Sequence, residues 1–172
     1  MKILALEFSS RQRSAAVTDD ADVLSEIITD QLKTGPLILI EQALDQAQID
    51  REEIQCLALG IGPGSYTGIR SAIAVAQGWQ LARDTPLSAV SSAEILAATA
   101  RRNGLRGETH FIIDAQRHEY YHCAWQLDDQ SQLETTPLSI IGVTSAAELK
   151  AYGPDTAGFP SCETLYPSAA VL

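Results

Sequence analysis

Two carboxylates and one glycine-rich turn are the residues of this sequence best suited to chemistry on a phosphorylated ligand. Glu7 and Asp114 each end a short apolar run, and a carboxylate in that position can hold magnesium bound to a nucleotide. Between them lies the run Gly60-Ile61-Gly62-Pro63-Gly64-Ser65-Tyr66-Thr67-Gly68-Ile69-Arg70. Backbone N–H groups in such a turn, placed before a helix, can surround a phosphate. These features raise the hypothesis of an ATP-dependent phosphotransferase.

The glycine-rich run fits neither common nucleotide-binding motif. No Gly-Lys-Ser/Thr follows it, and its first three glycines recur at every second position rather than in the order Gly-x-Gly-x-x-Gly. Gly62, Gly64 and Ser65 could line a phosphate, or Ser65 could simply cap a helix after a tight turn. Past Asp114 the chain offers no second glycine-rich loop with a following helix. We therefore expect an incomplete nucleotide site and no catalysis by this chain alone.

A second candidate motif is His118-Glu119-Tyr120-Tyr121-His122, which matches the His-Glu-x-x-His pattern of zinc peptidases. That chemistry needs a helix, so that both imidazoles reach one zinc ion. Here the segment is rich in aromatic residues and follows a strand and a turn, which predicts a strand. Residues four apart on a strand lie about 13 Å apart. We therefore expect no metal at this motif, and a zinc peptidase is the weaker alternative.

Charge and cysteine content limit the partners and the compartment. With 12 basic and 22 acidic residues the net charge is −10, so we expect contact with nucleic acid only through a partner, because such contact needs cations that neutralise phosphates. Cys56, Cys123 and Cys162 are far apart and odd in number, which favours free thiols in a reducing compartment. No export signal or apolar run of about 20 residues is present. We expect a cytoplasmic protein with no membrane contact.

The apolar patterning predicts an α/β protein with two lobes, residues 1–104 and 105–172. In the first lobe the predicted order is β-β-β-α-β-α-β-α, with strands at 2–8, 14–18, 23–29, 54–59 and 87–90 and helices at 37–48, 66–83 and 92–102. The second lobe is shorter and β-rich, with strands at 109–114, 120–127 and 133–141 and a short helix at 145–150. The glycines in 103–108 mark a hinge. Both lobes begin with a strand that ends in a carboxylate, a weak sign of duplication.

The first two predicted helices are apolar on nearly all sides. Residues 71–81 carry no charge, and residues 36–44 carry only Glu41. A helix of this kind is buried on two sides, and the sheet covers only one of them. We therefore predict a protein–protein interface, made by a partner or by a second copy in a homodimer when the chain is alone. Its predicted central residues are Leu37, Ile40, Glu41, Leu44, Tyr66, Ile69, Arg70 and Ile73.

The glycine-rich run also resembles a known family signature. Residues 60–70 are similar to the Gly-Pro-Gly-Ser-Phe/Tyr-Thr-Gly-Leu/Ile/Val-Arg signature of the TsaB family, also called YeaZ. Residues 3–7 and 113–117 resemble family elements in the same order, and the similarity covers residues 1–127. The sequence departs from the family at Glu7, where aspartate is usual, at Lys33, where histidine is common, and at Leu39, where proline is common.

The resemblance implies an actin-like (ASKHA, ribonuclease H-like) fold of two lobes, the second of them short. It implies a non-catalytic scaffold that activates a catalytic TsaD subunit and works with the ATPase TsaE. Together these proteins place a threonylcarbamoyl group on the tRNA adenosine next to the anticodon. By this resemblance the partners handle ATP and magnesium and the chain meets tRNA only indirectly. Glu7, Gly62, Gly64, Ser65 and Asp114 would be remnants of a nucleotide site.

Overall fold

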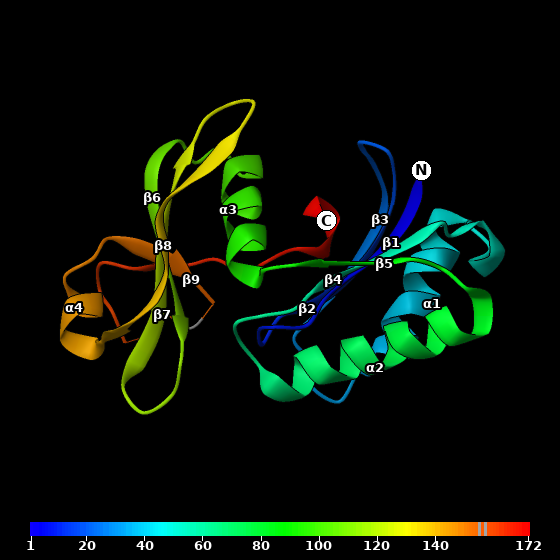
Figure 1. Cartoon of the computed structure of the whole chain (residues 1–172), viewed down its shortest axis with the longest axis horizontal. Coiled ribbons are helices and arrows are strands. Elements are labelled where there is room, and N and C mark those ends of the chain that lie inside the picture. Colours follow the sequence, from blue (N-terminus) through cyan, green and yellow to red (C-terminus); the bar gives the residue numbers. More distant parts are fainter. Residues whose placement is uncertain (155, 157) are drawn as a thin grey trace. The chain divides into compact units, whose positions relative to one another are not determined.

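The computed structural model describes residues 1–154, 156 and 158–172 (Figure 1). They divide into two compact units, Met1–Ser91 with Ser168–Leu172, and Ser92–Pro167. The division differs from the predicted one at 104/105, because the helix after Ser91 packs within the second unit and the last five residues pack within the first. No helix of the described residues is long and apolar enough to span a membrane.

The first unit is built on a five-stranded sheet in the order β3-β2-β1-β4-β5. The strands β1 (Lys2–Glu7), β2 (Arg13–Asp19) and β3 (Asp22–Thr29) form an antiparallel meander. On the other side of β1, the strands β4 (Cys56–Gly60) and β5 (Leu87–Val90) run parallel to it. β1 therefore lies at the centre of the sheet, and its C-terminal end reaches the glycine-rich turn.

Helices α1 (Pro36–Ala47) and α2 (Tyr66–Arg83) pack on one face of this sheet. Side chains alternate between the two faces of a strand, so Leu4 and Leu6 of β1 enter the core under the helices. A one-turn 3₁₀ helix, η1 (Arg51–Glu53), connects α1 to β4. On the opposite face Ala5 packs with the short C-terminal 3₁₀ helix η2 (Ala169–Val171), which sequence patterning did not predict.

The second unit repeats the strand order of the first. Its sheet has the order β10-β9-β6-β7-β8. The strands β6 (Gly107–Asp114), β7 (Glu119–Leu127) and β8 (Gln132–Gly142) form an antiparallel meander, and β9 (Ala151–Gly153) and β10 (Glu163–Thr164) continue it in parallel. The shared order supports the duplication inferred from the two strand–carboxylate segments.

Two helices of unequal length cover the second sheet. Helix α3 (Ser92–Arg102) packs Leu96 against Phe111 and Leu127 on one face. The five-residue α4 (Val143–Ala147) packs Ala146 near Ile112 on the other face. The short helix predicted at 145–150 therefore begins and ends earlier. Sequence patterning also did not predict β9 and β10, because runs of three and two residues leave no periodic signal.

Cys123 is expected to be the least reactive of the three thiols. Burial raises its pKa to about 11, so roughly one thiol in a thousand is ionised at pH 8, and the thiolate is the reactive form. Cys56 and Cys162 are only partly buried. Titration of the native protein with a disulfide reagent should label Cys123 last, and equal labelling rates for all three would contradict the burial.

Candidate functional site

The glycine-rich turn packs against the end of β1 and caps α2. The Ser65 N–H donates to the Ser9 carbonyl at 2.6 Å, and the Ser65 hydroxyl accepts from the Gly68 N–H at 3.3 Å. A β-carbon on Gly64 would lie 2.1 Å from the Ser9 oxygen. The structure thus confirms the capped-turn interpretation, in which glycines allow close approach of two backbone segments and Ser65 is the N-cap.

The two candidate carboxylates are bonded within their own units. Glu7 is fully buried, and its Oε1 accepts the Ser9 N–H at 2.6 Å. Its Oε2 lies so close to Gly60 that a β-carbon there would be 1.8 Å away. Asp114 ends β6 in the second unit, where its two oxygens accept from the N–H and side-chain amide of Gln116 at 2.7 and 3.1 Å. Each carboxylate therefore has a structural role in ordering a strand end.

The surface of α1 and α2 contains some, but not all, of the predicted interface residues. Leu37 and Tyr66 are 65% and 70% exposed. Glu41 and Arg70 are also exposed, and Ile69 and Ile73 are half-buried. The assignment of Ile40 and Leu44 to the surface was wrong: they are 3% and 4% exposed, because the sheet side of α1 carries them into the core.

Two apolar residues of this surface were missed from the sequence. Ile38 is 50% exposed and Leu81 is 89% exposed. Leu81 is the last residue of the uncharged stretch 71–81 of α2, and that stretch was the signal that could have found it. We name the exposed residues Leu37, Ile38, Tyr66, Arg70 and Leu81 the helix surface. Tyr66 and Arg70 belong to residue types enriched at protein interfaces, and the other three are exposed apolar side chains.

Arg70 and Tyr66 contact each other on the helix surface. The Arg70 guanidinium carbon lies 5.0 Å from the centre of the Tyr66 ring, and the guanidinium also donates to the Tyr66 hydroxyl. The two residues are four apart in α2, so they lie on the same side of the helix. A contact of this kind brings an arginine and an aromatic ring together on the exposed side of α2.

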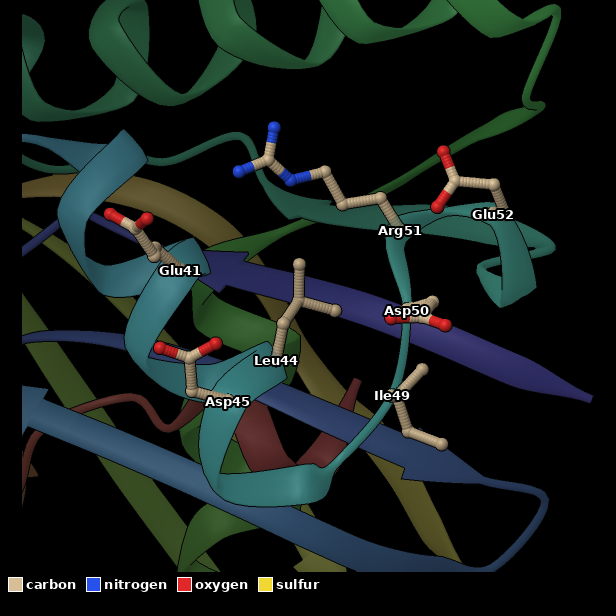
Figure 2. A pocket seen from close by; sticks show the side chains of 7 residues that line it. All are labelled: Glu41, Leu44, Asp45, Ile49, Asp50, Arg51 and Glu52. Atoms are coloured by element: carbon tan, nitrogen blue, oxygen red, sulfur yellow. The ribbon is translucent and has the colours of Figure 1, made fainter.

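An acidic pocket of about 350 Å³ lies beside the C-terminal half of α1 (Figure 2). Leu44 lies between the carboxylates of α1 and the facing segment 49–52, which carries Asp50, Arg51 and Glu52. Glu52 is paired with Arg83 at 2.8 Å. Glu41 and Asp45 lie on the α1 side of the pocket. Neither forms an ion pair with another of the described residues.

The segment with the zinc-peptidase pattern lies on a turn and a strand. His118 belongs to the β6–β7 turn, and Glu119 to His122 lie in β7, which confirms the predicted strand. Gln116, Arg117 and His118 all have positive φ, between 57° and 68°, a conformation uncommon outside glycine. The helix that the zinc-peptidase pattern requires is therefore not formed.

Comparison with known proteins identifies a family model and relatives that are similar to this chain. The family model described as "TsaD: tRNA N6-adenosine threonylcarbamoyltransferase" matches residues 26–154. The chain is 30% identical over 131 residues to the tRNA threonylcarbamoyladenosine biosynthesis protein TsaB of Escherichia coli, which covers 75% of this chain and 57% of that protein. For TsaB of Bacillus subtilis the values are 32% over 130 residues, 73% and 56%. The chain thus spans little more than half the length of these relatives.

A solved structure shares the fold over nearly the whole chain. YeaZ from Pseudomonas aeruginosa superposes with a TM-score of 0.85 at 26% identity, covering 99% of this chain and 87% of that one. Two repeated units of three antiparallel and two parallel strands, flanked by helices, define an actin-like α/β fold. With the glycine-rich signature at residues 60–70, the chain belongs to the TsaD family as the model defines it, and within it to the TsaB (YeaZ) group.

Proposed function

We propose that this chain is a non-catalytic scaffold in the threonylcarbamoylation of the tRNA adenosine next to the anticodon, acting by binding a TsaD-type catalytic subunit. The single observation that carries the proposal is the helix surface, where Leu37, Tyr66 and Leu81 are exposed on elements that otherwise pack on the sheet. The relatives of this chain are named for biosynthesis of threonylcarbamoyladenosine in tRNA. A second copy of the chain would cover the same surface when no partner is present.

The internal use of the glycine-rich turn supports the absence of catalysis by the chain alone. The Ser65 N–H and hydroxyl both serve the packing of α2 on β1, so they are not held ready for a phosphate. Glu7 is fully buried and accepts from its own strand end. In this proposal the partner subunits, including a TsaE-type ATPase, handle ATP and magnesium. The internal bonds of the glycine-rich turn and of Glu7 within the first unit disfavour the alternative of an autonomous ATP phosphotransferase.

The acidic pocket indicates the charge that a partner would carry where it meets α1. Glu41 and Asp45 are four residues apart on α1, an arrangement of like charges that disfavours the isolated helix, and Asp45 lies in its last turn, where the helix dipole also disfavours a negative charge. A partner with Lys or Arg next to its apolar contact would relieve both effects. Because the chain carries a net charge of −10, contact with tRNA would pass through such a partner in the cytoplasm.

The proposal predicts that tRNA modification requires the chain together with its partners and does not occur with the chain alone. Purified chain, cognate TsaD and TsaE proteins, ATP and unmodified tRNA should yield modified adenosine, detected by mass spectrometry of digested tRNA. Omission of the chain should abolish most of the product. Turnover by the chain alone, removed by Glu7→Ala or Asp114→Ala, would support the phosphotransferase and exclude the scaffold.

A further inference from the structure

A buried arginine holds the loop between β3 and α1. Arg13, the first residue of β2, is 9% exposed. Its Nη1 donates to the Leu32 carbonyl at 2.9 Å and to the Thr34 carbonyl at 3.3 Å. Its guanidinium carbon lies 5.5 Å from the centre of the Phe8 ring, and Phe8 is part of the core under α1 and α2. Arg13 therefore ties the loop to the core on the helix side of the first sheet.

The environment of Arg13 is unfavourable for a charge. Within residues 1–154, 156 and 158–172 no carboxylate forms an ion pair with its guanidinium, and its buried Nε has no hydrogen-bond acceptor. Burying a charge without a counter-ion opposes folding, so the arginine adds little stability to the chain. Both loop carbonyls accept from this one guanidinium, so the loop can move away only by leaving the charge with fewer acceptors. The arginine thus favours one position of the loop.

The loop exposes a leucine while its backbone is hydrogen-bonded. Leu32 is 61% exposed, although its carbonyl accepts from Arg13. The Thr34 N–H donates to the Gln31 carbonyl at 2.9 Å, which places Leu32 in the second position of a β-turn. The loop leads directly into α1, where Leu37 of the helix surface is 65% exposed. Exposed apolar side chains therefore continue along the chain from the start of α1 into the loop before it.

We propose that residues 31–34 form a second contact region for the partner that binds the helix surface, with Leu32 as its apolar anchor and Arg13 as the residue that positions it. The inference rests on the function proposed above. A standard interface involves about 20–30 residues on each side, far more than the helix surface supplies, so the same partner has to cover neighbouring segments. The loop is the segment that enters α1, and Leu32 would fit an apolar recess of that partner.

Leu32→Asp tests the contact directly. The full chain with this substitution should bind the partner, a TsaD-type subunit, at least about tenfold more weakly in a calorimetric titration, because the complex would bury an unpaired carboxylate. The melting temperature of the free chain should not change, since Leu32 is exposed. The matched control is Leu133→Asp on β8, a leucine that is 67% exposed and lies in the second unit. It should bind like the unsubstituted chain.

Arg13→Met tests the positioning role. Methionine is an unbranched side chain that fills a similar space without a charge, and replacement of a buried charge by an apolar side chain is often neutral or stabilising. The melting temperature of the free chain should therefore stay the same or rise. Binding of the partner should nevertheless weaken at least about fivefold, as for loss of an interface side chain, because the loop carbonyls lose their donor. A purely structural arginine would lower both quantities together.

These two variants and Leu37→Asp separate the inference from the proposed function. If Leu37→Asp binds weakly while Leu32→Asp binds fully, the loop is outside the contact and the inference is wrong, although the proposed function stands. If neither leucine variant weakens binding, the proposed function fails too. If Arg13→Met unfolds or melts at a lower temperature, the arginine has a structural role and its positioning role is refuted. Leu32→Asp still decides the contact in that case.

Discussion

Gly68→Ala is expected to destabilise the first unit by about 3 kcal/mol, the upper end of the cost of overpacking a well-packed site. A β-carbon on Gly68 would lie 2.0 Å from the Phe8 carbonyl oxygen and 3.2 Å from the Ser65 hydroxyl. The nearer atom is backbone directly after the central strand β1, so it cannot move aside without disturbing the end of that strand. Relief would require α2 to lift from β1, which would also break the bond from the Ser65 N–H to Ser9. Urea unfolding followed by circular dichroism measures the loss.

Gly78→Ala is the matched control, because it makes the same substitution ten residues later in the same helix. A β-carbon there meets no atom within 4 Å, and alanine is favoured over glycine inside a helix by about 0.5–1 kcal/mol. The two variants should therefore shift the urea midpoint in opposite directions. Equal midpoints would show that the approach of Gly68 to Phe8 does not position α2.

The local structure of the first unit was predictable from sequence because its signals are strong. The predicted helix at 66–83 and strand at 87–90 agree with the observed α2 and β5. Ser65 provides an N-cap at the start of α2, and Pro36 occupies the first turn of α1, where its missing N–H costs nothing. Short polar turns separate β1, β2 and β3. In each case the signal lies within a few residues of the start or end of the element that it marks.

The side of α1 that enters the core could not be read from the sequence. Its first half, Pro-Leu-Ile-Leu-Ile, is apolar on every side, so helical periodicity gives no preferred direction. The structure buries Leu39 and Ile40 and exposes Leu37 and Ile38. Only contacts with strands distant in sequence make this choice. The same limit explains the errors at Ile40 and Leu44, which were assigned to the surface.

The domain division and the contact between two histidines depend on segments far apart in the chain. Helix α3 joins the second unit because Leu96 packs with Phe111 and Leu127, although a glycine-containing hinge follows it. The pairing of His110 with His122 depends on the β6–β7 register. The His-Glu-x-x-His motif paired His122 with His118, although the ring nitrogens of His122 and His110 are 3.1 Å apart. A sequence pattern reports spacing along the chain and not partners across a sheet.

Leu37→Asp is expected to weaken binding of the proposed TsaD-type partner by about 30-fold or more, the effect of losing a hot-spot contact of 2 kcal/mol. Leu37 is 65% exposed in the free chain, so the substitution removes no core contact. It is the second residue of α1, where the helix dipole favours a negative charge. The free protein should keep its melting temperature, while the complex would have to bury an unpaired carboxylate. Titration of the variant with the partner, by calorimetry or native mass spectrometry, measures the loss.

Leu133→Asp tests whether the effect belongs to the helix surface or to any exposed leucine. Leu133 lies on β8 in the second unit and is 67% exposed, so it matches Leu37 in residue type, exposure and change of charge. It should bind the partner as tightly as the unsubstituted chain, and modification of tRNA should follow the same order. Equal loss in both variants would point to a general effect of added negative charge. Full binding by Leu37→Asp would show that the partner contacts another part of the chain, because a contact at the helix surface would bury the new carboxylate at the start of α1. This conclusion would hold even if the chain still supports tRNA modification.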